Sequence, residues 1–220
     1  MQPDPSGPVL VRDLRCEELA AAVAITARAM RDNPINVRVL GGSPRMRVKA
    51  LTRLFRAGLG RTMHKGVLLG AFRAGELAGV AGLLRPGCCQ LLPAETLATL
   101  PALLTSIQLP AIVRMSRWLS DWKAQDLHEA HWHLGPVAVE PGLQGQGVGA
   151  ALLIEACARI DRVGLAGYLE TDKAANVGFY ERFGFQTVAE ADVLGVANWF
   201  MQRPGSAPPA ISEDERPSLA

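Results

Sequence analysis

The sequence predicts an α/β (α+β) fold with a mixed central sheet of about six or seven strands, flanked by helices. Two local patterns indicate it: a pair of apolar runs joined by a short glycine-containing turn, and a later apolar run that leads through a glycine-rich loop into a strong helix. Of the 220 residues, 49% are hydrophobic and 20% charged, as is typical of globular proteins. We therefore expect one domain over residues 1–203 and a disordered tail rich in Pro, Ser and acidic residues over 204–220.

The first part of the chain predicts one strand and two helices. Val9–Arg12 is a short apolar run, and apolar residues at helical spacing over Cys16–Met30 predict a helix that stops at Asn33-Pro34. Ser43-Pro44 is typical of an N-cap followed by proline in the first turn, and the apolar face that follows ends before Gly60. Two helices are therefore expected ahead of the main sheet.

The middle of the chain predicts a hairpin and then an insertion. Val67–Arg73 and Leu77–Leu84 are apolar runs whose connection contains Gly75, a residue that readily adopts a positive φ. Residues 86–127 combine helical spacing with interrupting prolines, so we expect a helical insertion before the fourth strand. The prolines also argue against a membrane span, which needs about 20 unbroken apolar residues.

The rest of the chain alternates between strand and helix. The expected strands are His131–Val139, Leu165–Thr171, Phe185–Ala189 and Asn198–Arg203, and the expected helices are Gly149–Val163 and Asn176–Arg182.

Charge and cysteine content narrow the class of protein. The 23 Lys and Arg residues against 21 Asp and Glu give a net charge of +2 with no block of like charge, which argues against nucleic acid as a partner. The four cysteines lack C-x-x-C spacing, and the first seven residues lack the basic start and apolar run of a secretory signal. We therefore expect a cytoplasmic protein with reduced thiols and no membrane segment.

A glycine-rich loop, Gln144-Gly145-Gln146-Gly147-Val148-Gly149, separates the strand that ends at Val139 from the next helix. Glycines let successive backbone N–H groups point into one concavity, and the helix N-terminus adds partial positive charge, so the loop suits a pyrophosphate. One interpretation is a dinucleotide-binding fold, with Glu170 about 20 residues further on. The five residues from Glu140 to Gln144 argue against it, because that fold places its first glycine almost directly after the strand.

The same region resembles the GNAT acetyltransferase family. The resemblance begins at Val137-Ala138-Val139-x-Pro141 and Gln144-x-x-Gly147-x-Gly149, and it continues through Tyr168–Thr171, Asn176 and Phe179–Phe185. It covers residues 134–185, and within the family the chain is most similar to the puromycin acetyltransferase type. The combination of motifs is more specific than a glycine loop alone.

The resemblance implies the GNAT fold, in which parallel strands 4 and 5 of the sheet splay apart around the coenzyme. It implies acetyl-CoA as co-substrate and no metal, with direct attack of an amine on the thioester. The candidate cofactor-binding residues are Val137, Ala138, Val139, Gln144, Gly145, Gln146, Gly147, Val148, Gly149, Asn176 and Tyr180.

The resemblance also implies catalytic roles. Tyr180 falls at the position of the acid that protonates the departing thiolate, one helical turn after Asn176. His133 is the candidate base, because imidazole titrates near neutral pH and some family members use histidines on this strand. Glu129 and Glu170 compete for this role.

His131 and His133 alternate along the expected strand, so both point to one face. The same face carries Val137 if no bulge intervenes at Gly135-Pro136. As a metal site, the His-x-His pair lacks an evident third ligand in the sequence, so we expect no metal centre.

The acceptor is expected to be a small-molecule amine with an apolar body. The stretch from Pro86 to Val113 has Glu95 as its one charge in 28 residues and falls next to the strand with the histidines. The alternatives are a protein or peptide N-acetyltransferase, a non-catalytic acyl-CoA-binding module and a dinucleotide oxidoreductase. We expect no nucleic acid or membrane partner. The one oligomer that we consider for this chain is a homodimer.

Overall fold

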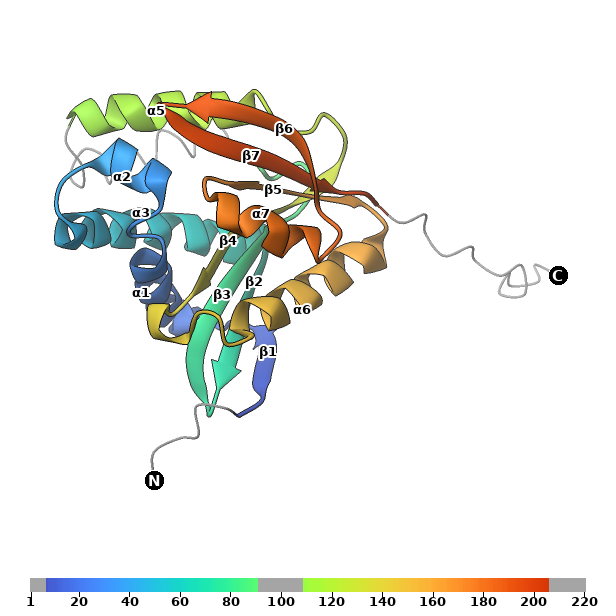
Figure 1. The fold of residues 1–220 in the computed structure, drawn as a ribbon. Coiled ribbons are helices and arrows are strands. Elements are labelled where there is room, and N and C mark those ends of the chain that lie inside the picture. Colours follow the sequence, from blue (N-terminus) through green and yellow to red (C-terminus); the bar gives the residue numbers. More distant parts are fainter. Residues whose placement is uncertain (1–6, 91–108, 206–220) are drawn as a thin grey trace.

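The computed structural model describes residues 7–90 and 109–205. Seven strands form one sheet in the order β1-β2-β3-β4-β5-β7-β6 (Figure 1). The strands are β1 Val9–Asp13, β2 Gly66–Arg73, β3 Glu76–Leu84, β4 His131–Val139, β5 Ala166–Thr171, β6 Gln186–Val193 and β7 Val196–Arg203. The helices are η1 Cys16–Glu18, α1 Leu19–Ala29, α2 Pro34–Leu40, α3 Pro44–Lys65, α5 Leu109–Lys123, η2 Pro141–Leu143, α6 Val148–Val163 and α7 Ala174–Glu181. The mixed sheet with flanking helices confirms the predicted fold class.

Helices cover both faces of the sheet, because the apolar side chains of β2 and β3 alternate between two cores. Leu68 and Val80 pack with Leu59 of α3 in one core. Leu69 and Leu83 face the opposite way and pack with residues of α6 in the other. Figure 1 shows α1 and α3 on one side of these strands and α6 on the other. Of the helices in the described ranges, none combines the length and the apolar character that crossing a bilayer requires.

Strands β4 and β5 run parallel but pair over only three residues. Their register runs from His131 opposite Ala166 to His133 opposite Tyr168. In the described sheet no further pair joins them, although β4 continues to Val139 and β5 to Thr171. The predicted splay of the fourth and fifth strands is therefore confirmed.

A bulge in β4 lies just beyond the last of these pairs. Leu83 of β3 pairs with Leu134, whereas Ala81, two residues away, pairs with Val137. The extra residue on β4 reverses the alternation of its side chains, so Val137 points away from the face that carries His133. The condition for His133 and Val137 to share a face is therefore not met.

The N-terminal region holds one helix more than expected. Pro34 does end the α1 segment, but it also begins α2, because its fixed φ suits the first turn of a helix. Ser43 caps α3 as predicted by accepting a hydrogen bond from the backbone N–H of Met46, and the helix continues past Gly60 to Lys65. Three α-helices, not two, therefore separate β1 from β2.

The expected hairpin and half of the expected insertion lie within the described residues. Ala74 and Gly75 both adopt positive φ, of 49° and 82°, as a two-residue hairpin turn with the twist of the strands requires. In the insertion, α5 contains the predicted face of Ile112, Met115, Leu119 and Trp122. The other predicted piece, with Leu97, Leu100, Leu103 and Leu104, and most of the expected tail lie outside the described residues.

The close approach of β3 to the bulge predicts opposite effects for two glycine substitutions. A Cβ on Gly82 would lie 2.6 Å from the carbonyl oxygen of Gly135, so Gly82→Ala should lower the free energy of unfolding by about 1–3 kcal/mol. A Cβ on Gly58, in the middle of α3, meets nothing within 4 Å, so Gly58→Ala should raise it by about 0.5–1 kcal/mol. Urea unfolding of both variants measures the difference, and a neutral Gly82→Ala would contradict the close approach.

Candidate active site

A cavity of about 740 Å³ lies where β4 and β5 diverge. One part of its lining comes from β4, the loop before α6, the end of β5 and α7. The other part comes from α2, α3 and α5, whose sequence positions are far from that loop. The cavity therefore has one wall built from residues 133–182 and a second wall built from distant segments.

The glycine loop forms one end of the cavity. Gly147 is the N-cap of α6 and has a left-handed φ of 84°, and Gly145 has a φ of 75°. Both conformations favour glycine over residues with a Cβ. The N–H groups of the first turn of α6 have no partner within the helix, so this end of the cavity suits an anion.

Two glutamines hold the loop in shape. Arg73 of β2 donates to the side-chain oxygen of Gln146 at 2.8 Å and to its backbone oxygen at 2.7 Å. The Gln146 amide donates to the carbonyl of Gly142 at 3.1 Å, and that of Gln144 donates to the carbonyl of Val139 at 3.2 Å. Gln144 and Gln146 therefore use their side-chain N–H groups on the backbone of the loop itself.

Most of the predicted cofactor-binding residues line the cavity. Gln146 and Val148 are the two that do not, and Val148 is buried against the β3 side of the core. The lining members are Val137, Ala138, Val139, Gln144, Gly145, Gly147, Gly149, Asn176 and Tyr180.

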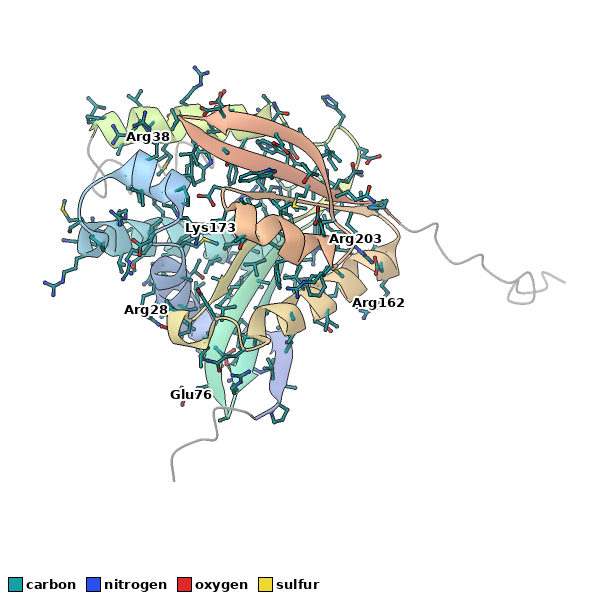
Figure 2. The ribbon with its side chains drawn as sticks, viewed as in Figure 1. Arg28, Arg38, Glu76, Arg162, Lys173 and Arg203 are labelled. Carbon is teal, nitrogen blue, oxygen red and sulfur yellow. The ribbon has the colours of Figure 1, made fainter. Side chains whose placement is uncertain are left out.

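The β4 segment from Val137 to Val139 presents one backbone edge to the cavity. On the other edge it pairs with Ala81, Val80 and Gly79 of β3. Because β5 has already diverged, the edge away from β3 has no strand beside it among the described residues. Directly after this segment, Glu140 forms an ion pair with Arg28 of α1 at 2.6 Å, which fixes the strand end (Arg28 is labelled in Figure 2).

Tyr180 and Asn176 project from α7 into the cavity one turn apart, as predicted. The Asn176 amide donates to Thr171 Oγ1 at 3.2 Å, which joins α7 to the end of β5. Tyr180 is 8% exposed, and none of the described residues bonds to its hydroxyl. Burial, with the nearby charge of Asp172, raises the pKa of Tyr180 well above its usual value, so the phenol keeps its proton.

His133 and Glu170 face each other across β4 and β5 at the cavity. His133 Nε2 lies 3.0 Å from Glu170 Oε2, and both residues line the cavity. Burial alone would lower the pKa of His133, but the Glu170 carboxylate and the Cys89 thiol outweigh it and hold that pKa above its usual value. Glu129, the third candidate base, is not in the lining, and its carboxylate accepts a hydrogen bond from Gln202 at 2.7 Å.

A cluster that the sequence did not predict lies beside this pair. Cys89, His131 and His133 bring a sulfur and two ring nitrogens within 4.8 Å of one another. A third candidate ligand, which was not evident in the sequence, therefore lies beside the His-x-His pair. Cys89 follows β3 and lies 42 residues before His131, so no local spacing could reveal the contact.

The cluster changes the acidity of its members. Burial would raise the pKa of Cys89, but His131 and His133 outweigh it and lower the pKa to about 7. Burial would lower the pKa of His131, but Asp126 and Cys89 raise it to about 10. A positively charged imidazole beside a thiolate accounts for both directions.

Three aromatic residues line the second wall, and Asp172 of the first wall is bonded to it. Phe55 and Trp122 lay on predicted apolar faces, and Trp118 did not. The Asp172 carboxylate accepts the backbone N–H of Ile35 at 2.8 Å and the amide of Asn33 at 3.3 Å, so it fixes the start of α2. Trp118 and Trp122 of α5 meet edge to face with ring centroids 5.0 Å apart, and both line the cavity. Phe55 of α3 also lines it.

Comparison with known proteins agrees with this geometry. Residues 112–187 match the family model described as acetyltransferase (GNAT) domain, a segment that contains β4, the glycine loop, β5 and α7. The matched segment and the fold together indicate that the chain is an acetyltransferase with a GNAT domain. Among the described strands only β4 and β5 are paired in parallel, whereas a dinucleotide-binding fold requires an open, mostly parallel sheet.

Solved structures with the same fold come from several organisms. One of them is a Corynebacterium glutamicum protein described as histone acetyltransferase HPA2 and related acetyltransferase. Its sequence is 21% identical to this chain and its TM-score is 0.70, and the alignment covers 91% of this chain and 98% of that chain. PaiA N-acetyltransferase from Thermoplasma acidophilum, solved in complex with coenzyme A, is 14% identical with a TM-score of 0.57, over 90% and 99%. The ribosomal-protein-S18-alanine N-acetyltransferase from Escherichia coli is 17% identical with a TM-score of 0.54, over 91% and 96%. At these identities the likeness shows the fold alone.

Proposed function

We propose that this chain is an acetyl-CoA-dependent N-acetyltransferase that acetylates the primary amine of a small molecule by direct attack. The observation that carries the proposal is a single cavity that joins the anion-binding loop before α6 to the neutral, buried phenol of Tyr180. Acyl transfer from a thioester needs such an arrangement: a coenzyme held at its phosphates and an acid near the sulfur. The four cysteines are free, which fits the predicted cytoplasmic location.

Coenzyme A would bind along the first wall of the cavity. Its pyrophosphate would accept hydrogen bonds from the N–H groups of Gly147–Gly149, and its pantetheine arm would follow the unpaired edge of Val137–Val139. Lys173, at the start of α7 (Figure 2), and Arg182, after its end, also line the cavity and add positive charge. The coenzyme A complex of the Thermoplasma neighbour supports this assignment.

The chemistry requires one bond to form and one to break. The amine nitrogen attacks the thioester carbonyl carbon, the C–N bond forms, and the C–S bond breaks when the tetrahedral intermediate collapses. Tyr180 gives its proton to the departing thiolate. Backbone N–H groups at the β4 edge stabilise the charge on the carbonyl oxygen.

Glu170 would receive the proton that the amine loses, directly or through one water. Its carboxylate lines the cavity, and its Oε2 is held by the N–H of His133 at 3.0 Å. His133 is the candidate base in the sequence, but an imidazole that already donates to a carboxylate orients that carboxylate. We therefore assign the proton acceptor to Glu170 and an orienting role to His133.

The second wall favours an acceptor with an apolar body. Phe55, Trp118 and Trp122 offer aromatic faces, and the carboxylates of Glu170 and Asp172 attract an ammonium group. The resemblance to the puromycin acetyltransferase type supports a small-molecule acceptor. The names of the Corynebacterium and Escherichia neighbours support the alternative of a protein amine, which acceptor profiling distinguishes.

Substitution of the N-cap glycine of α6 tests coenzyme binding. Gly147→Val places a branched side chain at a left-handed φ and beside the expected path of the phosphates, so coenzyme A should no longer raise the melting temperature. Gly142→Ala is the matched control, because its Cβ meets nothing within 4 Å and its φ is ordinary. Thermal shift with coenzyme A, and with NAD as a comparison ligand, measures the effect. A response of the parent to NAD alone would overturn the assignment.

Loss of the phenol hydroxyl tests the general acid. Tyr180→Phe should lower kcat by about 10²- to 10⁴-fold and leave the thermal shift by coenzyme A unchanged, because the ring stays and the proton donor is removed. Since the pKa of Tyr180 is raised, the wild-type rate should not fall as the pH rises to about 10, the usual pKa of tyrosine. Steady-state rates across pH check both. A fully active Tyr180→Phe would show that water protonates the thiolate. Glu170→Gln tests the proposed proton acceptor in the same assay.

Acceptor profiling tests the class of substrate. With acetyl-CoA and amines at matched concentrations, aromatic and aliphatic amines should give the highest kcat/KM, measured by release of free thiol. An apolar pocket discriminates by about 1–3 kcal/mol per misplaced methylene, so the series should show a preferred size. Faster turnover of aminoglycosides or histone-like peptides would favour the polar or protein acceptor. Binding of acetyl-CoA with no turnover of any amine would favour the non-catalytic module.

A further inference from the structure

Three chain segments converge behind the cavity at the paired ends of β4 and β5. Cys89 comes from the turn after β3, His131 and His133 from β4, and Asp126 from the segment between α5 and β4. Cys89 Sγ lies 3.3 Å from His131 Nε2, and Asp126 Oδ1 lies 3.1 Å from the same nitrogen. His131 is 4% exposed, and Cys89 and His133 are partly buried, so most of the cluster lies below the surface.

Each histidine has one ring nitrogen held by an acceptor outside the cluster. His131 Nδ1 lies 2.8 Å from the carbonyl oxygen of Glu129, and His133 Nε2 lies 3.0 Å from the Glu170 carboxylate. These acceptors fix a proton on the nitrogen they face, so the other nitrogen of each ring is the one that can give up its proton to bind a metal ion. An outer carbonyl or carboxylate on each imidazole is the usual support of a metal-ligating histidine.

The free nitrogen of His133 is an independent observation. Its Nδ1 is buried, and within the described residues no hydrogen-bond partner reaches it. A buried polar atom without a partner costs free energy, because it has lost its contact with water. A metal ion within the cluster would supply the missing partner.

The spacing and the ligand types fit zinc. With bonds of about 2.3 Å to sulfur and 2.0–2.1 Å to nitrogen or oxygen, a tetrahedral zinc ion places its ligand atoms about 3.3–3.6 Å apart. The two measured separations, 3.3 Å and 3.1 Å, are close to these edges, and the sulfur and both ring nitrogens fall within 4.8 Å. One thiolate with two imidazoles in a tetrahedral arrangement favours zinc over magnesium or calcium, which prefer oxygen.

Cys89, His131 and Asp126 do not form a nucleophilic cysteine triad. A triad needs the cysteine at one nitrogen of the histidine and the carboxylate at the other. Here Cys89 and Asp126 both lie next to Nε2 of His131, and Nδ1 is hydrogen-bonded to the carbonyl oxygen of Glu129. Cys89 and Asp126 therefore lie on the side of the His131 ring where a metal ion would bind Nε2.

We propose that Cys89, His131 and His133 form a zinc-binding site, with Asp126 at the fourth position directly or through a water. Binding removes the protons that the thiol and the two liganding nitrogens carry, and releases them to solvent. The site joins the two ends of the insertion to β4, because Cys89 precedes α5 and Asp126 follows it. Zinc would therefore fix the position of α5, whose Trp118 and Trp122 line the cavity.

Metal titration of the full chain tests the proposal. After removal of metals with a chelator, Zn²⁺ added in competition with a chromophoric chelator should bind at one equivalent per chain and raise the melting temperature. Co²⁺ in its place should give the absorption of a tetrahedral site with a thiolate-to-cobalt charge-transfer band. Cys89→Ser should abolish that band and weaken the Kd for Zn²⁺ at least about 100-fold.

Cys88→Ser is the matched control, because it removes the neighbouring thiol and should leave the band and the Kd unchanged. Should Cys89→Ser fail to fold, alkylation of the wild-type chain decides: Zn²⁺ should protect Cys89, and the exposed Cys16 should react as before. Three results would overturn the proposal. They are Zn²⁺ binding well below one equivalent per chain, a cobalt spectrum without the thiolate band, and a loss of the band and of Zn²⁺ affinity in Cys88→Ser equal to that in Cys89→Ser. Alkylation of Cys89 at the same rate with and without Zn²⁺ would overturn it as well.

Discussion

The pairing between β4 and β5 ends at His133 and Tyr168, and the cavity exists because the two strands separate beyond that pair. A sheet normally satisfies the backbone of each inner strand on both edges, so a strand that keeps one neighbour and loses the other must find partners elsewhere. Beyond the separation, the edge of Val137–Val139 has the cavity beside it. An extended ligand with amide groups can therefore bind where a strand would otherwise lie. The bulge in β4 lies between the pairs Leu83–Leu134 and Ala81–Val137, directly after the last residue that pairs with β5.

The two walls of the cavity differ in how the chain builds them. The wall that suits the coenzyme comes from residues 133–182, all within the matched GNAT segment of 112–187. The opposite wall takes Ile35 and Phe55 from helices far earlier in the chain and Trp118 from α5. The proposed coenzyme site is thus built from one continuous segment of the chain. The contacts that choose an acceptor are scattered, and similarity of fold says little about them.

Local patterns are sufficient for part of this structure and fail where distant residues meet. The hairpin at Gly75, the cap at Ser43 and the loop before α6 are predictable, because each depends on the conformational preferences of a few adjacent residues. The pattern at Pro34 misses a helix, because a proline ends one helix and begins another with equal ease. The bulge in β4 and the approach of Cys89 to His131 could not be predicted, since both follow from how β3 pairs with β4 and not from either sequence alone.

Asp172 joins parts of the molecule that are otherwise separate in sequence. It follows β5 directly, beside the cavity lining of α7, and yet it accepts the backbone N–H of Ile35 and the amide of Asn33 at the start of α2. Both bonds end on a buried carboxylate, where hydrogen bonds to charge are strong. The end of β5 is therefore connected to the start of α2 by direct hydrogen bonds to Asp172. The two walls of the cavity are consequently joined directly at Asp172, between the end of β5 and the start of α2.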